Sequence, residues 1–383
     1  MTQSRSSEYA RFAALLPELV AVVLRRENSP ERMASAGARL GGLLVWGVEH
    51  SRFCAELTGS DIAEACRRQP FRPVRPVHGG GYTVGMELPR DSSTLARFKA
   101  SGPSGEPLEI LVCHQDAEKI IAADGVIASK LVKRLHSHPK RMSAADLASL
   151  FRMLVAMAVQ EADLSAEADG LQLGSGSKWL IAPRLVERGD RFLVETALPG
   201  YLAEDLPGPS AGTAYHRTVR SWAWMLLQDG VLQTSLRRDQ IRFHDDDSIG
   251  VTRWAGAYRP GPAVYAFAPT LAQAAFGPSA ADRARHRTSL LGLLAYGLGI
   301  AGALEDLADL CLALVSQGGP LQVSRPLMPG LFIREQDVTA PDRIGLVRML
   351  RQLVWFRDLG QVCGAADLSA PWQELAHDTR SEV

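Results

Sequence analysis

The sequence predicts an α+β protein with a small lobe that contains a sheet, a larger and mainly helical lobe, and a helical N-terminal extension. Three observations predict this architecture. Helical periodicity runs to about residue 69, strand and turn patterns alternate with helical ones up to about residue 200, and mostly helical periodicity follows Gly200. We therefore expect an extension at 1–69, a small lobe at 70–200 and a helical lobe at 201–383.

The N-terminal extension is expected to consist of helices. Residues 7–27 have the period of an amphipathic helix, and residues 31–67 carry two or three shorter helical patterns. Three prolines between residues 70 and 76, followed by Gly79-Gly80-Gly81, then break the periodicity. We place the boundary of the extension at this break.

The small lobe is expected to combine strands with helices. Tyr82–Leu88 and Leu108–His114 have strand patterns and flank a turn at Ser101–Pro107. A helix is expected at 116–136, and the clearest helix of the chain at Ala144–Ala168.

A second pair of strands is expected at Trp179–Ala182 and Arg191–Thr196, joined by a turn at Gly189–Asp190. In the helical lobe, the run Asp245–Asp247 favours a polar turn between two strands. Helices of this lobe are expected at 213–229, 286–316 and 342–358.

The composition limits the classes of function. Lys+Arg and Asp+Glu both number 42, so the net charge is zero and no overall basic field favours nucleic acid. The five cysteines are widely spaced and form no metal-ligand cluster, so we expect reduced, buried thiols and no metal site. No apolar run reaches the roughly 20 residues of a membrane-spanning helix, and no signal peptide is visible. We expect a cytoplasmic protein, with peripheral contact to a membrane left open.

Four segments, in one order along the chain, carry a family resemblance. Residues 105–112 read GEPLEILV, residues 161–168 read EADLSAEA, residues 191–200 read RFLVETALPG, and residues 229–240 read DGVLQTSLRRDQ. They resemble the VAVKV strand, the ExDxxxEA helix, the hinge and the catalytic segment of the UbiB (AarF) family of atypical protein-kinase-like proteins. The resemblance extends over roughly residues 39–258, and it implies a bilobal protein-kinase-like fold.

The helix motif and the start of the catalytic segment are retained. Glu161, Asp163 and Glu167 keep the acidic positions of ExDxxxEA, although they point to more than one helix face and amphipathicity does not demand them. Asp229 and Gly230 keep the opening of the family's DGFFHADPHPGN segment.

Four positions that serve phosphoryl transfer in the family are replaced. Leu111 stands at the Lys of the strand motif, Ser235 at the catalytic Asp, and Gln240 at the metal-binding Asn. Arg253 stands at the Asp of the DFG motif, or Thr252 does if the alignment shifts by one residue. Because phosphoryl transfer depends on positioned charges, the resemblance implies a degenerate member with no catalytic residue, no metal and no cofactor.

Arg253 has the wrong sign of charge for a metal ligand. If its side chain points inward, it would repel Mg²⁺ from the position where the family binds the metal. It could instead hold a phosphate, or pair with Glu161 or Glu167.

The first functional prediction is a pseudokinase that acts as a non-catalytic accessory, regulatory or scaffold protein through a protein partner. The family's usual setting implies isoprenoid-quinone (ubiquinone) biosynthesis, other lipid metabolism or another biosynthetic pathway.

Two alternatives stay open. One is a divergent ATP-binding kinase or ATPase, in which Mg²⁺ is held by a site rebuilt from Glu161, Asp163, Glu167 and Asp239. The other is a module that binds a lipid or apolar ligand in the interlobe cleft, which Leu111 makes more apolar than in a kinase. The candidate cleft residues are the glycines Gly79, Gly80 and Gly81, whose amides could cradle a phosphate, and the hinge residues Glu195, Thr196 and Ala197.

The expected helix at 342–358 could bind anionic lipid heads or an acidic partner, because it carries several arginines. We favour a helix that docks on the core and exposes a solvated basic face. Trp222 and Trp224 are interpreted as core residues. The arginines of the helix are Arg343, Arg348, Arg351 and Arg357.

Overall fold

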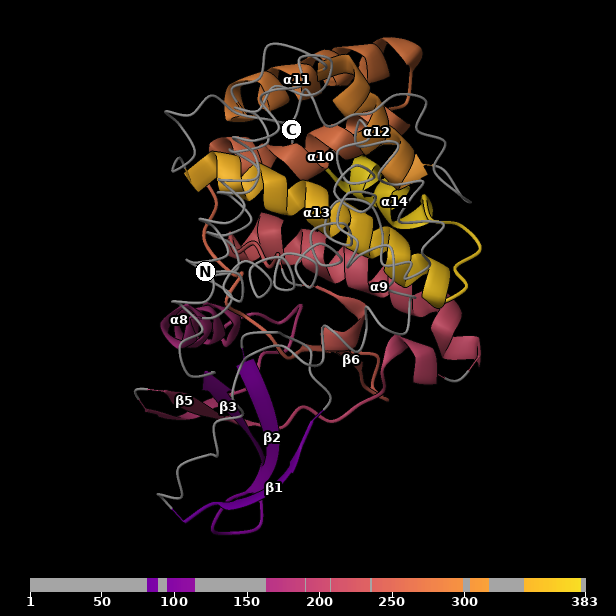
Figure 1. Ribbon diagram of the computed structural model, residues 1–383. Coiled ribbons are helices and arrows are strands. Elements are labelled where there is room, and N and C mark those ends of the chain that lie inside the picture. Colours follow the sequence, from indigo (N-terminus) through magenta and orange to yellow (C-terminus); the bar gives the residue numbers. More distant parts are fainter. Residues whose placement is uncertain are drawn as a thin grey trace, which may run out of the picture.

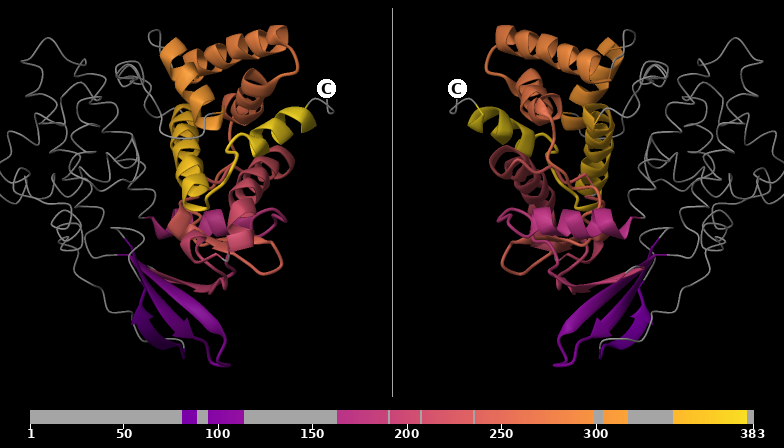
Figure 2. Two further views of the ribbon diagram at one scale, coloured as in Figure 1. Left: turned by 90° about the vertical axis from the view of Figure 1, so that its right-hand side faces the viewer. Right: turned by 90° about the vertical axis from the view of Figure 1, so that its left-hand side faces the viewer.

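The computed structural model describes residues 81–88, 95–113, 163–189, 191–206, 208–234, 236–298, 304–316 and 341–379. These residues form a sheet at one end of the molecule and a mainly helical lobe at the other, as Figures 1 and 2 show. The expected fold class, α+β with a small sheet-containing lobe followed by a helical lobe in the kinase-like order, is confirmed. The expected helical extension and the predicted helix at 116–136 lie outside the described residues.

The sheet is antiparallel throughout and has the strand order β1-β2-β3-β5-β4. Its edge strand β1 and its central strand β3 were expected, whereas β2 was not. Strand β2 carries Arg97 and Lys99 on the face that also holds Leu95, so it lacks a clean alternation of apolar and polar residues. The strands are β1 Thr83–Glu87, β2 Leu95–Ser101, β3 Pro107–Cys113, β4 Leu185–Arg188 and β5 Phe192–Thr196.

The two faces of the sheet bury different sets of side chains. One face holds an apolar cluster that includes Phe98, Ile110 and Val194. On this face the Tyr82 hydroxyl donates a hydrogen bond of 2.7 Å to the Glu187 carboxylate. The other face packs on helix α8, with Leu95, Leu111 and Leu193 against Leu164 and Ala168. The sheet is thus attached to the rest of the molecule through α8.

Helix α8 spans Leu164–Gly174, so the expected continuous helix over Ala144–Ala168 is wrong at Asp163. Asp163 has extended backbone (φ −80°, ψ 111°), and its side chain accepts a hydrogen bond from the Ser165 amide at 2.7 Å. A carboxylate that accepts from the first free amides starts a new helix, because it satisfies a donor that lacks an intrahelical partner. The helix then continues past Ala168.

The expected strand at Trp179–Ala182 is also wrong. Strand β4 lies further along, at Leu185–Arg188, and it pairs with β5 through a turn that includes Gly189. Ile181 instead pairs with the helical lobe, since its amide donates to Ile249 and its carbonyl accepts from Val251. A single parallel bridge therefore connects the small lobe directly to the helical lobe.

The helical lobe contains six described α-helices and one hairpin. Helices α10 and α14 were not predicted. Helix α10 is apolar on most sides and has a proline inside it, so it has no clear amphipathic period, and α14 has only 9 residues. The expected helix at 286–316 is two helices on either side of residues 299–303. The elements are η1 Ala203–Asp205, α9 Gly208–Trp224 with the π-helical turn η2 Met225–Asp229, η3 Arg238–Gln240, β6 Ile241–Phe243, β7 Ile249–Val251, α10 Pro262–Phe276, α11 Ala280–Leu298, α12 Leu304–Ser316, α13 Pro341–Val362 and α14 Ala370–Asp378.

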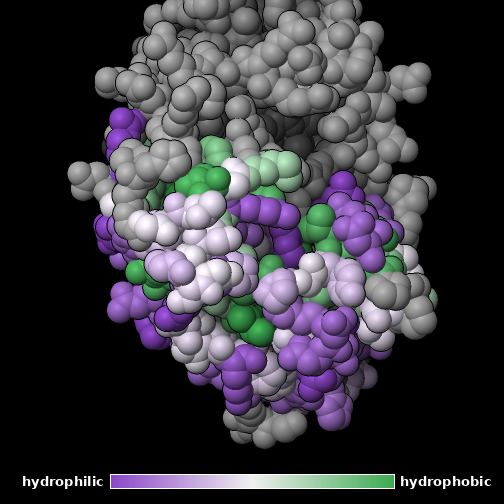
Figure 3. Space-filling view, turned by 90° about the horizontal axis from the view of Figure 1, so that it is seen from below, coloured by the Kyte–Doolittle hydropathy of each residue, from purple (hydrophilic) through white to green (hydrophobic). Residues whose placement is uncertain are grey.

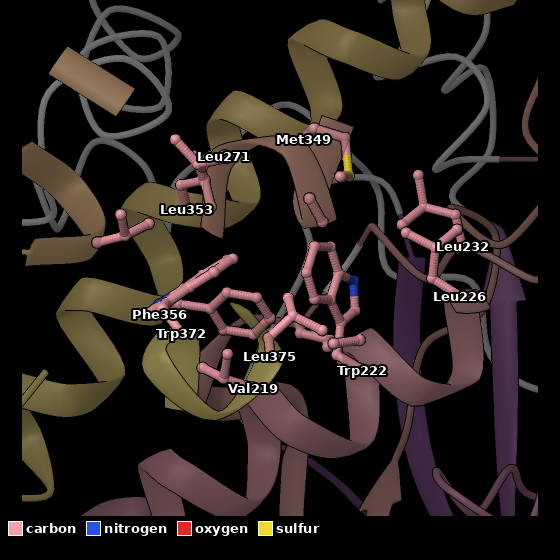
Figure 4. Packing of buried hydrophobic residues seen from close by; sticks show 14 of the residues in the cluster. Val219, Trp222, Leu226, Leu232, Leu271, Met349, Leu353, Phe356, Trp372 and Leu375 are labelled. Atoms are coloured by element: carbon pink, nitrogen blue, oxygen red, sulfur yellow. The ribbon is translucent and has the colours of Figure 1, made fainter. Parts of the chain in front are cut away.

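An aromatic cluster joins three helices at the centre of this lobe (Figure 4). Trp222 of α9, Phe356 of α13 and Trp372 of α14 meet edge to face, with ring centroids 5.0–6.5 Å apart. Such pairs stabilise a core by about 0.5–1.5 kcal/mol each beyond their area. Trp222 is therefore a core residue as expected, while Trp224 is half-buried and stacks on Trp179.

Helix α13 docks on the core as expected, with Leu346, Met349 and Leu353 buried. The expected solvated basic face is wrong for two of its arginines, because Arg348 is 5% exposed and Arg357 is 2% exposed. The Arg348 guanidinium lies over the Tyr258 ring, and Arg357 donates to the Ala313 carbonyl at 3.1 Å. The side chains of Arg343 and Arg351 lie outside the described ones.

The β6–β7 hairpin has the polar turn expected at Asp245–Asp247. Asp246 accepts hydrogen bonds from the amide and the hydroxyl of Ser248. Its neighbour Asp247 has a positive φ of 67°, which aspartate tolerates in a turn better than most residues. None of the described helices is long and apolar enough to cross a membrane.

Two glycines allow α8 to pack closely on Trp254. A Cβ on Gly170 would lie 1.9 Å from the Trp254 carbonyl oxygen, and a Cβ on Gly174 would lie 2.4 Å from the Trp254 ring. The first contact is with backbone, so it cannot be relieved by a side-chain rotation. The close approach of α8 to residue 254 therefore depends on glycine at these positions.

We expect Gly170→Ala to lower the free energy of unfolding by about 1–3 kcal/mol, because the added methyl group forces helix and loop apart. Gly292→Ala in α11 is the matched control, since nothing lies within 4 Å of its Cβ. It should raise the free energy of unfolding by about 0.5–1 kcal/mol. Urea unfolding of the two variants measures both effects, and equal effects would contradict the close packing.

Candidate interlobe site

Leu111 lies in the middle of β3 and is fully buried. Its side chain packs with Leu164 and Ala168 of α8 and with Leu193 of β5. A lysine at this position would have to bury its ammonium group among these apolar side chains, at a large cost in desolvation. The strand position at which the kinase motif has its Lys is thus part of an apolar contact that fixes α8 to the sheet.

Glu167 is the central polar residue of the site. It lies on α8, is completely buried, and receives three hydrogen bonds from one loop of the helical lobe. Its carboxylate accepts from the Arg253 Nε at 3.0 Å, from the Trp254 amide at 2.5 Å and from the Ala255 amide at 3.1 Å. A buried carboxylate is stable only when such donors surround it. Glu167 therefore binds α8 to residues 253–255.

Arg253 points into the protein and is 4% exposed. Its ion pair with Glu167 is one of the two pairings that the sequence left open for it. The carbonyl of Arg253 accepts a hydrogen bond of 2.8 Å from the side chain of Gln233. Thr252, the other candidate for this alignment position, is buried too and donates through its hydroxyl to the Gln240 carbonyl. Arg253 is thus held through its guanidinium by Glu167 and through its backbone carbonyl by Gln233.

The segment that aligns with the kinase catalytic loop is anchored by hydrogen bonds to backbone. The Thr234 hydroxyl donates to the Gly256 carbonyl at 2.8 Å. Gln352 of α13 clamps Leu236, since its side chain accepts from the Leu236 amide and donates to the Leu236 carbonyl. Gln240 is buried at the end of η3. Ser235 lies outside the described residues, and so does the side chain of Asp239.

Three further charged residues that are buried lie on the α8-facing side of the sheet. Arg97 of β2 forms an ion pair with Glu109 of β3, and both side chains are buried. Glu195 of β5 is completely buried, and its Oε1 lies 3.6 Å from the Arg97 guanidinium. In the cross-strand register Glu109 is opposite Glu195. The two strands therefore place two carboxylates side by side with one arginine next to them.

Burial raises the pKa of the Glu195 carboxyl well above its ordinary value. The Arg97 guanidinium opposes this rise, whereas the charges of Glu167 and Glu109 add to it. Arg253 lowers the pKa again, but by the smallest amount. Two carboxylates close together in a medium of low dielectric constant cannot both ionise without a large cost, so Glu195 favours its protonated form.

Sequence reasoning missed Arg97 and Glu109, and it named Glu195 only as a hinge residue. A signal was present at Glu109, because the VAVKV motif has Ala where this chain has a carboxylate. For Arg97 no strand was expected, so its inward orientation could not be inferred.

The remaining acidic residues of the retained motifs serve the local fold. Asp163 caps α8, and Asp229 accepts a hydrogen bond of 2.8 Å from the Ser177 hydroxyl. Gly230 ends the π-helical turn in a left-handed conformation (φ 63°) that favours glycine. In the part of the chain that the structure describes, no three potential ligands gather to hold a metal ion. The possible metal site consisted of Glu161, Asp163, Glu167 and Asp239. The side chains of Asp163 and Glu167 have other roles, and Glu161 lies outside the described residues.

The candidate cleft residues fall into two groups. Gly81 is exposed just before β1 with φ 82°, and Gly79 and Gly80 lie outside the described residues. At the hinge, the Thr196 amide donates to the Arg184 carbonyl at 3.0 Å and the Ala197 amide to the Pro107 carbonyl at 3.1 Å. Both hinge amides are therefore used within the small lobe, and neither is offered to a ligand.

A magnesium–nucleotide complex does not fit these residues. The metal would need carboxylates, yet Arg253 places a cation at the expected position and its partner Glu167 already has three donors. The phosphates would need the strand lysine, for which Leu111 offers no charge. The arrangement holds two lobes together, and we derive no reaction step from it.

We expect Glu167→Ala to lower the free energy of unfolding by about 3–5 kcal/mol, because it removes the carboxylate that accepts from the buried Arg253 Nε and from two buried amides. Arg253→Met should cost less, since Glu167 keeps its two amide donors and methionine fills the volume. Urea unfolding measures both losses.

The control for this pair is Glu374→Ala, which removes the surface contacts of one carboxylate with Arg220 and His216. It should cost no more than about 1 kcal/mol. A loss for Glu167→Ala as small as that of the control would contradict the role assigned to the Glu167 carboxylate.

No family model and no curated protein matches the chain. Among solved structures, the chain is similar to Rv3197 from Mycobacterium tuberculosis, which was determined as a complex with erythromycin. The two are 13% identical, the match covers 75% of this chain and 76% of that one, and the TM-score is 0.48. At these values the similarity carries no argument about activity, and the fold assignment rests on the order and packing of the chain's own elements.

Proposed function

We propose that the chain is a pseudokinase of the UbiB/AarF type that acts as a non-catalytic accessory, regulatory or scaffold protein. The observation that carries this proposal is the buried ion pair between Arg253 and Glu167. In the family resemblance, Arg253 stands at the metal-binding Asp of the DFG motif, or Thr252 does if the alignment shifts by one residue. In a kinase, the strand lysine and the metal ion attract the neighbouring elements to each other. Here the ion pair between the Arg253 guanidinium and Glu167 supplies this attraction between the loop and α8.

Two further features support the same proposal. Leu111 fills the position of the strand lysine with an apolar side chain that α8 covers. Arg97 and Glu109 form a buried ion pair on the α8-facing side of the sheet, and Glu109 stands at the alanine position of the VAVKV motif. A nucleotide base that occupied this position would have to displace a salt bridge, which is costly in a buried site.

The two alternatives have less support. A divergent kinase or ATPase needs carboxylates that converge on a metal, and Asp163 and Glu167 point to different partners. A module for lipids needs an apolar surface that faces a ligand, and Leu111 faces α8 instead. Each remains an outcome of the experiments below.

A non-catalytic member would act through what it binds. A protein partner remains our proposal, in isoprenoid-quinone or lipid metabolism or in another biosynthetic pathway. Peripheral membrane contact has less support from α13 than the sequence suggested, because Arg348 and Arg357 are buried. The coloured face in Figure 3 is mostly hydrophilic with small separate apolar spots, so any partner would meet a largely polar surface there.

The first test is binding and turnover of Mg-ATP by the full chain. We expect no rise in the melting temperature at saturating Mg-ATP and no release of phosphate, because a ligand stabilises a protein only if it binds the folded state. A rise of several degrees together with turnover that Glu167→Gln abolishes would establish the kinase or ATPase alternative instead.

The second test converts the cation at position 253 into a carboxylate. Arg253→Asp should be unstable alone, because it places a second carboxylate beside Glu167, and Mg²⁺ should restore its melting temperature. Arg253→Asn is the matched control of the same shape without charge, and Mg²⁺ should not stabilise it. If Mg²⁺ stabilises neither variant, position 253 does not correspond to the metal-binding Asp, and the alignment behind the proposal is wrong.

A further inference from the structure

Among the described residues, the junction between the sheet and the helical lobe contains five buried charged side chains from five places in the fold. Arg97 comes from β2, Glu109 from β3, Glu195 from β5, Glu167 from α8 and Arg253 from the loop after β7. All five are buried. Three carboxylates face two guanidiniums, so the group carries one excess negative charge if every member is ionised. Two exposed cations lie at the rim of this group: Arg188 of β4, whose guanidinium donates to the Ser165 hydroxyl of α8, and Lys99 of β2, which lies opposite Glu109. Directly opposite Glu195, β4 places the apolar Leu185.

The donors in this group are unevenly distributed. Glu167 receives three hydrogen bonds, and Arg97 forms its ion pair with Glu109. Neither oxygen of Glu195 receives a hydrogen bond from the described residues, and the 3.6 Å to Arg97 is too long for one. Glu195 is therefore the carboxylate of the three with the weakest contact to the two arginines.

An ionised carboxylate in this position would be expensive, because a buried charge without hydrogen bonds costs several kcal/mol. A proton on Glu195 removes the excess charge and leaves two carboxylates for two guanidiniums. The raised pKa of Glu195, caused first by burial, supports the same assignment.

Glu195 also occupies a sensitive place in the chain. It is the next-to-last residue of β5, and the chain crosses to the helical lobe within a few residues, where Tyr201 pairs with Phe243 of β6. A charge that forms on Glu195 acts at once on Glu109 of the sheet and on Glu167 of α8, both of which are negative. Repulsion of these neighbours would push the sheet away from α8.

We propose that Glu195 and its four charged neighbours form a proton-dependent latch between the lobes. With a proton on Glu195, the sheet stays docked on α8 and the helical lobe. When the proton leaves, water enters to solvate the carboxylate and the sheet loosens from α8, while the core of the helical lobe stays folded.

The direction of the pH dependence follows from the folded and unfolded states. In the unfolded chain Glu195 titrates at the ordinary value of 4.5, and in the folded chain its pKa is raised. Its contribution to stability is thus fully present below the ordinary value and is lost as the pH rises through the raised folded pKa. The latch is closed on the acidic side of this window and open on the alkaline side.

The test compares the wild type with Glu195→Gln, which keeps the shape of the side chain and cannot ionise. Amide hydrogen exchange is followed at several pH values, with helix α10 as the internal reference for the intrinsic rate. In the wild type, β3, β5 and α8 should lose protection relative to α10 as the pH rises, whereas in Glu195→Gln their protection should stay constant. The same loss of protection in both proteins, or none in the wild type, would overturn the proposal.

Infrared spectroscopy detects the proton directly. At a pH between the ordinary value of 4.5 and the raised pKa of Glu195, a protonated-carboxyl band should be present in the wild type and absent from Glu195→Gln. The matched control Glu106→Gln, which neutralises an exposed carboxylate beside β3, should keep the band. A wild type without this band would also overturn the proposal.

A second variant keeps the test decisive if Glu195→Gln fails to fold. Glu109→Gln leaves two carboxylates for two guanidiniums, so Arg97 can pair with Glu195 and the infrared band should vanish. Persistence of the band in Glu109→Gln would show that Glu195 does not hold the proton. These outcomes do not depend on whether the chain binds nucleotide, so this proposal and the proposed function can fail separately.

Discussion

The three hydrogen bonds to the Glu167 carboxylate are the interaction on which the arrangement of the lobes depends. They join α8 to the loop at residues 253–255, and α8 in turn carries the sheet through Leu164 and Ala168. A single carboxylate thus connects the covalently distant halves of the molecule. Because backbone amides supply two of the three donors, the position of the loop backbone is fixed as firmly as that of the arginine.

The polar and apolar contacts of α8 support each other. Leu111 excludes water on the sheet side of the helix, and the close packing of Trp254 excludes it on the side of the helical lobe. In this dry environment the ion pair between Glu167 and Arg253 is strong, since few water molecules screen it. The same dryness makes Glu195 unfavourable as an ion. The same environment therefore strengthens the ion pair of Glu167 and favours a proton on Glu195.

The sequence predicted the features that depend on local patterns. The α+β class, β3, β5, the helix at α13 and the turn at Asp245–Asp247 follow from periodicity and turn chemistry. Features that depend on tertiary context were missed. Strand β2 has Arg97 where a strand pattern requires an apolar residue. Arg97 is accommodated there because it forms an ion pair with Glu109 on the neighbouring strand. Arg348 and Arg357 suggested a solvated face, and their partners come from distant parts of the chain.

The candidate site was predictable only as a set of positions. The motifs identified Glu167 and Arg253 and suggested that they could pair, because the opposite charges of the two side chains can be read from the sequence. They could not reveal that Glu195 receives no hydrogen bond from the described residues, since this depends on the positions of Arg97 and Arg253 in the folded chain. The break of the helix at Asp163 shows the same limit, because a capping carboxylate and an acidic helix residue look alike in a sequence.

The two glycines of α8 have a consequence for how this protein can transmit a signal. Protein kinases are commonly regulated by a helix that swings toward or away from the loop behind it. Here Gly170 and Gly174 bring the α8 backbone against Trp254, so the helix cannot turn about its axis without a collision. Helix and loop would have to travel as one rigid piece. A partner that pulls on α8 would therefore displace residues 253–257, and the mechanical response would appear in the helical lobe.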